Sequence, residues 1–178
     1  GKGEHPTQAL FDAYTIHEHF GHLSDLNIVM GGGLRQGRTV RSLARLAALY
    51  PGNHLTFVST PEFRMGDDIK TMLDEHSVVW QETDEVHDAV QDADVVYWTR
   101  LQKERLESNS PEQIKEFVID RSVLDVMNTD AIITHPLPRV GEITPEIDDD
   151  PRAKYFRQAG NGLYARMALI EYFLRDKS

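Results

Sequence analysis

The sequence predicts a doubly wound α/β fold with three layers (α/β/α), about five parallel strands, and helices on both faces of the sheet. Two patterns along the 178 residues indicate this fold. Short apolar runs alternate with segments of helical periodicity, and the connections between them are short. Strand–helix–strand units with short connections form right-handed crossovers, which make the strands parallel and cover the sheet with helices.

The predicted strands are apolar runs bounded by polar or turn-forming residues. Continuous apolar runs of about four to eight residues are typical of strands that are buried on both faces. The runs lie near residues 26–30, 55–59, 78–81, 94–98 and 131–134.

Helical periodicity fills most of the sequence between these strands. Apolar residues that recur every three or four positions mark the buried side of a helix. The predicted helices lie near residues 38–50, 66–76, 86–92 and 111–128, the last of them broken into two.

Two further helices lie at the ends of the chain. The first runs from Pro6, a favoured first-turn residue, to Phe20. The second spans about residues 160–175, and only Arg166 and Glu171 interrupt its apolar sequence from 163 to 174. A helix that is apolar all round is buried on several sides. We therefore expect residues 1–178 to form one Rossmann-like domain, with both terminal helices packed on a further domain absent from this chain.

Composition excludes several classes of protein. A hydrophobic content of 40% argues against disorder, and the net charge of −10 is spread without a basic stripe, so nucleic acid is not an expected partner. No apolar run approaches the roughly 18 residues that span a bilayer, and no signal peptide opens the chain. The absence of cysteine excludes disulfides and thiolate metal sites. We expect a soluble, cytoplasmic protein without a membrane partner.

A polar segment from Thr99 to Arg105 follows the strand predicted at residues 94–98. Open α/β sheets bind ligands beyond the carboxyl ends of their strands. The segment holds Arg100 and Gln102, and the arginine fork binds carboxylates through paired hydrogen bonds. The alternative is a solvated face on which arginines form weak ion pairs. We expect the segment to bind a carboxylate.

The segment from His5 to Gln8 begins the first helix, where unpaired N–H groups and the helix dipole favour an anion or a carbonyl oxygen. His5 can donate to a carbonyl oxygen, and the side-chain carbonyl of Gln8 can accept from an amide NH2. Together they suit a carbamoyl-type group. The alternative is a simple capped helix start.

Glycines connect the first strand to the next helix, from Gly31 to Gly33 and again at Gly37. Glycine lets the backbone approach a ligand closely. The spacing partly imitates a dinucleotide fingerprint, but the acidic residue expected after the following strand is absent. Arg38 is more informative, because a cation at the positive end of a helix is unfavourable unless it meets an anion.

The last predicted strand is followed by the segment from His135 to Arg139. Pro136 and Pro138 bracket Leu137, which predicts an extended backbone with two fewer N–H donors and with carbonyl oxygens facing beyond the sheet. Carbonyl oxygens bind amines.

L-aspartate carries the groups that these segments would bind. Its two carboxylates suit Arg38 and Arg100 with Gln102, and its amine suits the carbonyls of Pro136 or Leu137.

At this point the residues resemble those of a known family. The chain is similar to the aspartate-binding half of aspartate carbamoyltransferase, and the resemblance covers essentially all of it. The motifs that carry it, in the order and near spacing of the family, are residues 5–8, 37–40, 99–105, 135–139, 142–143 and 155–162.

The resemblance implies carbamoyl transfer from carbamoyl phosphate to L-aspartate in pyrimidine biosynthesis, without a metal or organic cofactor. It implies that His5 polarises the carbamoyl carbonyl and stabilises its developing oxyanion. Gln8 and the carbonyls of Pro136 and Leu137 orient the carbamoyl nitrogen and the attacking amine. Arg38 then binds the α-carboxylate of aspartate.

The same resemblance assigns the β-carboxylate to Arg100 and Gln102. It adds two substrate-binding residues, Thr99 and Pro138. Behind the residues that touch substrate it places Glu104, Arg105 and Arg139, with Glu104 holding the rotamer of Arg100. The leaving phosphate is the expected proton acceptor, so no protein base is required.

Two departures from the family pattern qualify this interpretation. The family usually has Asp and Lys where this chain has Gly33 and Arg35, which leaves open whether activity is impaired. The family's amino-terminal carbamoyl phosphate domain, with its Ser-Thr-Arg-Thr loop, is also absent. We expect the isolated chain to be inactive or very weak, and the complete chains to form a homotrimer.

Three alternatives remain at this stage. Ornithine carbamoyltransferase shares the His-Pro-x-Gln element, but its Cys in place of Pro136 and its Asp-x-x-x-Ser-Met-Gly loop are missing here. A non-catalytic homologue acting as a scaffold would tolerate Gly33. A nicotinamide-binding oxidoreductase would have to bind a dinucleotide.

Overall fold

A parallel five-stranded sheet forms the centre of the computed structural model, which describes residues 4–101 and 117–175. The strand order is β3-β2-β1-β4-β5, and every neighbouring pair is parallel. This confirms the predicted doubly wound α/β fold, because the chain builds outward from β1 in one direction and then returns to build outward in the other. The strands are β1 (Asn27–Gly31), β2 (His54–Val58), β3 (Val79–Thr83), β4 (Val95–Trp98) and β5 (Ile132–Thr134).

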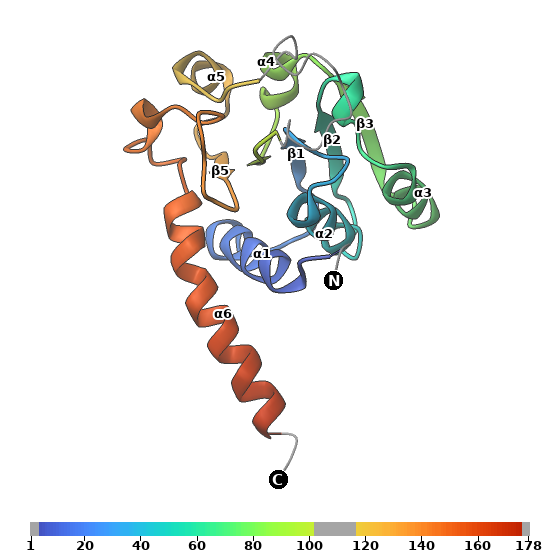
Figure 1. Ribbon diagram of the computed structural model, residues 1–178, viewed down its shortest axis with the longest axis vertical. Helices are drawn as coiled ribbons and strands as arrows, with labels where there is room; N and C mark the ends of the chain where they lie inside the picture. The colour runs from blue at the N-terminus through green and yellow to red at the C-terminus, as the bar shows by residue number, and fades with distance from the viewer. Residues whose placement is uncertain (1–3, 102–116, 176–178) are drawn as a thin grey trace.

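Helices cover both faces of this sheet (Figure 1). One apolar cluster joins one face of the strands to α1 (Pro6–Phe20), α2 (Arg38–Ala47) and α3 (Asp67–Glu75). A second cluster joins the opposite face to α4 (Val86–Val90) and α5 (Arg121–Val126). Short 3-10 helices at Pro61–Phe63 and Pro145–Ile147 complete the connections.

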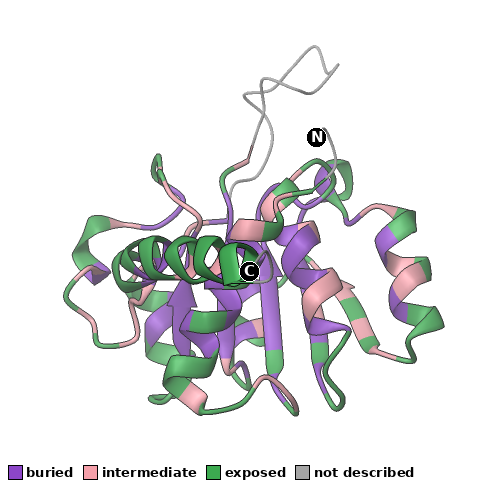
Figure 2. Cartoon of the chain, turned by 90° about the horizontal axis from the view of Figure 1, so that it is seen from below, coloured by how far each residue is buried: buried purple, intermediate pink, exposed green. Residues whose placement is uncertain are grey.

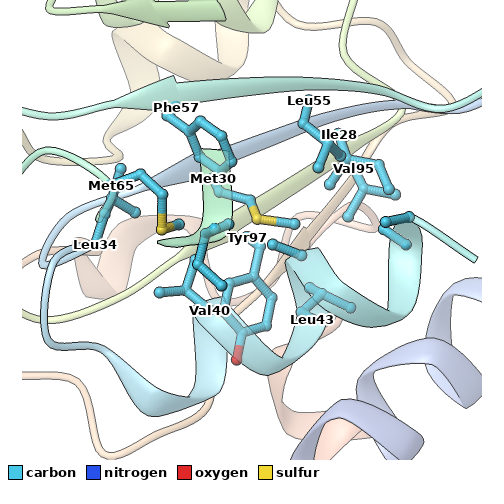
Figure 3. Packing of buried hydrophobic residues seen from close by; sticks show 14 of the residues in the cluster. Ile28, Met30, Leu34, Val40, Leu43, Leu55, Phe57, Met65, Val95 and Tyr97 are labelled. Atoms are coloured by element: carbon cyan, nitrogen blue, oxygen red, sulfur yellow. The ribbon is translucent and has the colours of Figure 1, made fainter. Parts of the chain in front are cut away.

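Alternation along the strands explains why both faces are apolar. Ile28 and Met30 of β1 point to the first cluster, whereas Val29 between them points to the second. Successive strand residues face opposite sides, so a strand covered on both sides needs a continuous apolar run. Figure 3 shows the first cluster, in which Tyr97 reaches from the sheet past Val40 with its hydroxyl at the far end.

The helix boundaries follow local capping chemistry. His5 caps α1, Pro6 occupies its first turn, and Gly21 ends it in the left-handed conformation at φ 78°. Asp120 caps α5 by accepting from the backbone N–H groups of Ser122 and Val123. Of the helix predicted near 111–128, only α5 lies in the described part, because residues 102–116 are outside it.

The closing helix α6 (Tyr155–Arg175) is longer than the sequence predicted. Its first turns contain Gly160 and Gly162, which are poor helix formers. In the structure Gly162 packs on α1, where an added Cβ would lie 3.3 Å from the ring of Phe11. Close packing of the two helices therefore outweighs the low intrinsic propensity.

The second half of α6 extends away from the body of the domain (Figures 1 and 2). Its large apolar side chains are more than half exposed, whereas the exposed large apolar side chains of α1 are Leu10 and Tyr14, both less than half exposed. Among the helices that the structure describes, none is both long and apolar enough to cross a membrane. The exposed apolar residues of α6 are Leu163, Tyr164, Met167, Ile170, Tyr172, Phe173 and Leu174.

Two glycine substitutions test the packing at the end of the sheet. A Cβ on Gly31 would lie 2.1 Å from the buried ring of Trp98, so Gly31→Ala should lower the free energy of unfolding by about 2 kcal/mol or more. Gly160 lies on an exposed part of α6 with no atom within 4 Å of an added Cβ, so Gly160→Ala should raise it by about 0.5–1 kcal/mol. Urea unfolding of both variants measures the difference, and equal effects would contradict this packing.

Candidate active site

A cavity of about 370 Å³ lies at the carboxyl ends of the strands, where the windings of the sheet diverge between β1 and β4. Ligands of open α/β sheets bind at this switch point. The start of α1, the turn from β1 into α2, and the residues after β4 and β5 form its walls. The lining residues are His5, Gln8, Gly33, Gln36, Gly37, Arg38, Thr39, Thr99, Arg100, His135, Pro136, Leu137 and Pro138.

The floor of the cavity depends on glycines that pack against β4. Gly32 has φ 95°, and an added Cβ would lie 1.9 Å from the carbonyl oxygen of Thr99. The backbone N–H and hydroxyl of Thr99 both donate to the carbonyl of Gly31, at 2.9 and 3.0 Å. The expectation that these two glycines make room for a ligand is therefore wrong, because protein atoms fill that space. Gly33 and Gly37 do line the cavity.

His5 is held at the start of α1 in one tautomer. The Nδ1 atom of His5 accepts a hydrogen bond from the backbone N–H of Gln8 at 3.3 Å. The backbone N–H of His5 donates to Ser42 Oγ at 2.8 Å. A backbone N–H only donates, so Nδ1 is the accepting nitrogen and the ring proton of neutral His5 is on Nε2. The ring can therefore donate to a ligand oxygen in the cavity.

The amide of Gln8 is also fixed in one orientation. Its Nε2 donates to Oδ1 of Asp12 at 2.7 Å, and Nε2 of Gln158 on α6 donates to the same oxygen at 2.6 Å. Gln8 thus keeps its carbonyl oxygen as the acceptor. Burial raises the pKa of Asp12 from its ordinary value to about 7, although the hydrogen bonds from Gln158 and Gln8 oppose the shift.

The loop after β5 is organised by His135. Leu137 N–H donates to His135 Nδ1 at 2.8 Å, so the ring proton is on Nε2, which donates to Oε1 of Glu142 at 2.8 Å. Burial raises the pKa of Glu142, but its hydrogen bonds with His135 and with the backbone N–H of Val140 outweigh this and leave that pKa lowered.

The predicted extended backbone around Leu137 is wrong. Leu137 has φ 49°, in the left-handed region that a branched side chain rarely adopts. Its N–H turns inward to His135, so the two flanking prolines bracket a bend. Such a conformation persists where the surroundings determine it, which is common at functional sites. Pro136, Leu137 and Pro138 nevertheless line the cavity as expected.

Arg38 and Arg100 reach the same cavity from different strands. Arg38 is the first residue of α2 after β1, and Arg100 lies two residues after the end of β4. No aspartate or glutamate is among the described lining residues, so the cavity suits an anion. Gln102, Glu104 and Arg105 lie outside the described residues.

Arg139 lies behind the loop. Its guanidinium pairs with both carboxylate oxygens of Asp148 and lies over the ring of Tyr155, 5.3 Å from the centroid. The neighbouring Arg139 holds the pKa of Asp148 below its ordinary value. Arg139 therefore anchors the end of the loop and does not line the cavity.

Several residues of this site had no role predicted from the sequence. Gln36, Thr39 and His135 line the cavity, and Asp12 and Gln158 support it. One local signal was available, because Gln8 and Asp12 are four residues apart on one helix face. Over residues 4–101 and 117–175, no group of three or more His, Asp or Glu side chains could hold a metal ion.

A family model named aspartate/ornithine carbamoyltransferase, Asp/Orn binding domain, matches residues 24–173. The chain belongs to this family. Its fold also matches the catalytic subunit of M. jannaschii aspartate transcarbamoylase, at 38% identity and a TM-score of 0.91 over 99% of this chain and 58% of that one. Trypanosoma cruzi aspartate transcarbamoylase in complex with carbamoyl phosphate and aspartate matches at 36% identity and a TM-score of 0.88, over 96% and 57%.

Curated relatives belong to the same family. The chloroplastic aspartate carbamoyltransferases of Oryza sativa subsp. japonica and Arabidopsis thaliana are each 46% identical over 98% of this chain. The chain spans 49% and 45% of their lengths, about half of each relative.

These plant relatives contradict the expectation of a cytoplasmic protein, because both are named as chloroplastic. The expectation rested on the absence of cysteine and of a signal peptide. Disulfides are confined mainly to oxidising compartments, so a sequence without cysteine does not distinguish the cytoplasm from other sites.

Stability should fall as the pH rises through the range in which the unfolded chain has ionised Asp12 and the folded chain has not. The pKa of Asp12 is raised from 3.8 to about 7 in the folded chain. The stabilisation that the neutral Asp12 carboxyl provides is therefore complete below pH 4 and lost by about pH 7. Between pH 5.5 and 7 the free energy of unfolding should fall by roughly 2 kcal/mol relative to Asp12→Asn. Chemical denaturation across this range measures both proteins, and parallel pH profiles would contradict the neutral buried carboxyl.

Proposed function

We propose that the complete protein transfers the carbamoyl group of carbamoyl phosphate to L-aspartate, giving N-carbamoyl-L-aspartate and phosphate in pyrimidine biosynthesis. This chain supplies the L-aspartate half of the site. The observation that carries the proposal is the convergence of Arg38 and Arg100 on one cavity that has no acidic residue among its described walls. The T. cruzi enzyme, with carbamoyl phosphate and aspartate bound, supports the choice of substrates.

The two arginines divide the carboxylates of aspartate between them. Arg38 takes the α-carboxylate at the start of α2, where the N–H groups of the helix also favour negative charge. Arg100 takes the β-carboxylate, and the family resemblance implies that Gln102 shares this role and that Glu104 holds the rotamer of Arg100. Arginine is suited to both positions because its planar fork makes two hydrogen bonds to one carboxylate.

The residues around the reacting carbon then orient the carbamoyl group. Nε2–H of His5 donates to the carbamoyl oxygen and stabilises the negative charge that develops there. The carbonyl oxygen of Gln8 accepts from the carbamoyl NH2, and the carbonyls at Pro136 and Leu137 accept from the attacking amine.

The chemical step needs no protein base. The amine lone pair of aspartate attacks the carbamoyl carbon, the new C–N bond forms, and the bond from that carbon to the phosphate oxygen breaks. The departing phosphate takes the proton that the amine loses. The protein contributes positioning and charge stabilisation, which account for most of the rate in transfers of this kind.

A second domain supplies the contacts to phosphate. The exposed apolar side of α6 is the surface on which we place this carbamoyl phosphate domain, because large contiguous apolar patches mark contact surfaces. Complete chains then form a homotrimer.

Ornithine carbamoyltransferase is the competing function, since the family model covers both activities. The curated relatives with 45–46% identity favour aspartate.

Replacing either arginine of the cavity tests the substrate. In the full-length protein, Arg38→Ala and Arg100→Ala should each lower kcat/KM for L-aspartate about 10- to 100-fold, the effect of losing charge-assisted hydrogen bonds. Arg121→Ala, which removes an exposed ion pair on α5, is the matched control and should change it less than about twofold. Steady-state formation of carbamoyl aspartate measures all three, and turnover with ornithine instead would contradict the proposal.

Removing the second domain tests the half-site. The 178-residue chain alone should form carbamoyl aspartate at less than about one thousandth of the full-length rate, because it lacks most phosphate contacts. Comparable activity of the two proteins would show that the chain holds a complete site.

A further inference from the structure

We infer that Asp12 is a positioning residue for catalysis, which holds the Gln8 amide with its carbonyl oxygen turned to the cavity. The inference rests on the proposed function where it concerns the carbamoyl group. Asp12 is fully buried on α1 and does not line the cavity, so it acts through Gln8.

The orientation follows from the hydrogen-bond types. Oδ1 of Asp12 receives Nε2 of Gln8 at 2.7 Å and Nε2 of Gln158 at 2.6 Å. Because Oδ1 also accepts from Gln158, the proton of the neutral carboxyl is on Oδ2, and turning the Gln8 amide over would bring its carbonyl oxygen against an acceptor and leave both oxygens unsatisfied in a buried place. The amide NH2 of Gln8 is therefore committed inward, and its oxygen is available to accept from a ligand NH2.

Asp12 is itself held from both sides. Gln158 approaches from α6, and its own carbonyl oxygen accepts the backbone N–H of His135 at 2.8 Å. The orientation of Gln158 is thus fixed by a backbone donor, which cannot reverse its polarity. The chain of hydrogen bonds from His135 through Gln158 and Asp12 to Gln8 joins two walls of the cavity.

A purely structural role does not explain a carboxyl group at this position. Oδ2 of Asp12 and the hydroxyl of Tyr97 are buried and lie close enough to affect each other's pKa, but neither makes a hydrogen bond of ordinary geometry in the described part of the chain. The contact between α1 and α6 has another polar link, because Asn161 donates to Thr15 and Glu18, each at 3.0 Å. An apolar side chain at position 12 would remove the unsatisfied Oδ2, but it would also leave the side-chain NH2 groups of Gln8 and Gln158 without their acceptor, and the Gln8 amide would be free to turn.

Substitutions at Asp12 separate positioning from packing in the full-length protein. Asp12→Leu removes the acceptor and should lower kcat about tenfold, with KM for L-aspartate changed less than about twofold, because the arginines are untouched. Asp12→Asn keeps an acceptor oxygen for both amides and should retain at least about half of kcat. If Asp12→Leu does not fold, Asp12→Ala removes the acceptor with a smaller change in shape.

A double-mutant cycle with Gln8→Ala decides whether Asp12 acts through Gln8. In the Gln8→Ala background, Asp12→Leu should lower kcat by less than about twofold, because no amide remains to be oriented. A further tenfold loss in that background, or an equal loss in Asp12→Asn, would overturn the inference.

A readout that does not need turnover keeps the inference separate from the proposed function. In this chain, the side-chain NH2 protons of Gln8, assigned by NMR with Gln8→Ala, should exchange slowly with solvent in the wild type and in Asp12→Asn. They should exchange rapidly in Asp12→Leu. If the wild type forms no carbamoyl aspartate, the proposed function fails, but the exchange rates still decide whether Asp12 orients the Gln8 amide. Unchanged exchange in Asp12→Leu would overturn it.

Discussion

The close approach of β1 and β4 at their carboxyl ends is the constraint on which the site depends. Gly31 lies against the ring of Trp98, and Gly32 lies against the backbone of Thr99, so neither position has room for a side chain. With the two strand ends in direct register, the residues that follow them begin from neighbouring points. Arg38 and Arg100 reach one cavity for this reason, although they are 62 positions apart in the sequence.

Buried polar groups then connect that cavity to the outer helices. The apolar clusters hold the sheet and helices together without fixing the direction of any polar side chain. Hydrogen bonds fix the direction of the polar side chains. Nε2 of Gln158 on α6 donates to Asp12 on α1, and the backbone N–H of His135 donates to the carbonyl oxygen of Gln158. A change in the packing of α6 therefore reaches the side chain of Gln8.

The fold was predictable because it depends on patterns local to each segment. Continuous apolar runs identified all five strands, and Pro6 and Gly21 marked the ends of α1. The start of α6 at Tyr155, before the predicted start near residue 160, was not predictable, because the added first turns include Gln158, whose side chain bonds to Asp12 far away in the sequence.

The residues of the site likewise fall into those that local sequence patterns predicted and those that they did not. Arg38, Arg100 and the segment at residues 136–138 were found because cations and prolines at strand ends are visible in the sequence. The bend at Leu137 and the link from Asp12 to Gln158 depend on partners that only the folded chain brings together. A pair 146 residues apart leaves no local signal.

The proposed function depends most on the binding of the two carboxylates of one aspartate by the two arginines. A crystal structure of the full-length protein with N-(phosphonacetyl)-L-aspartic acid, a ligand bound by the T. cruzi relative, tests this directly. We expect the guanidinium of Arg38 to lie within about 3 Å of the α-carboxylate of this ligand and the guanidinium of Arg100 within about 3 Å of its β-carboxylate. An aspartyl group bound outside this cavity, or held by neither arginine, would contradict it.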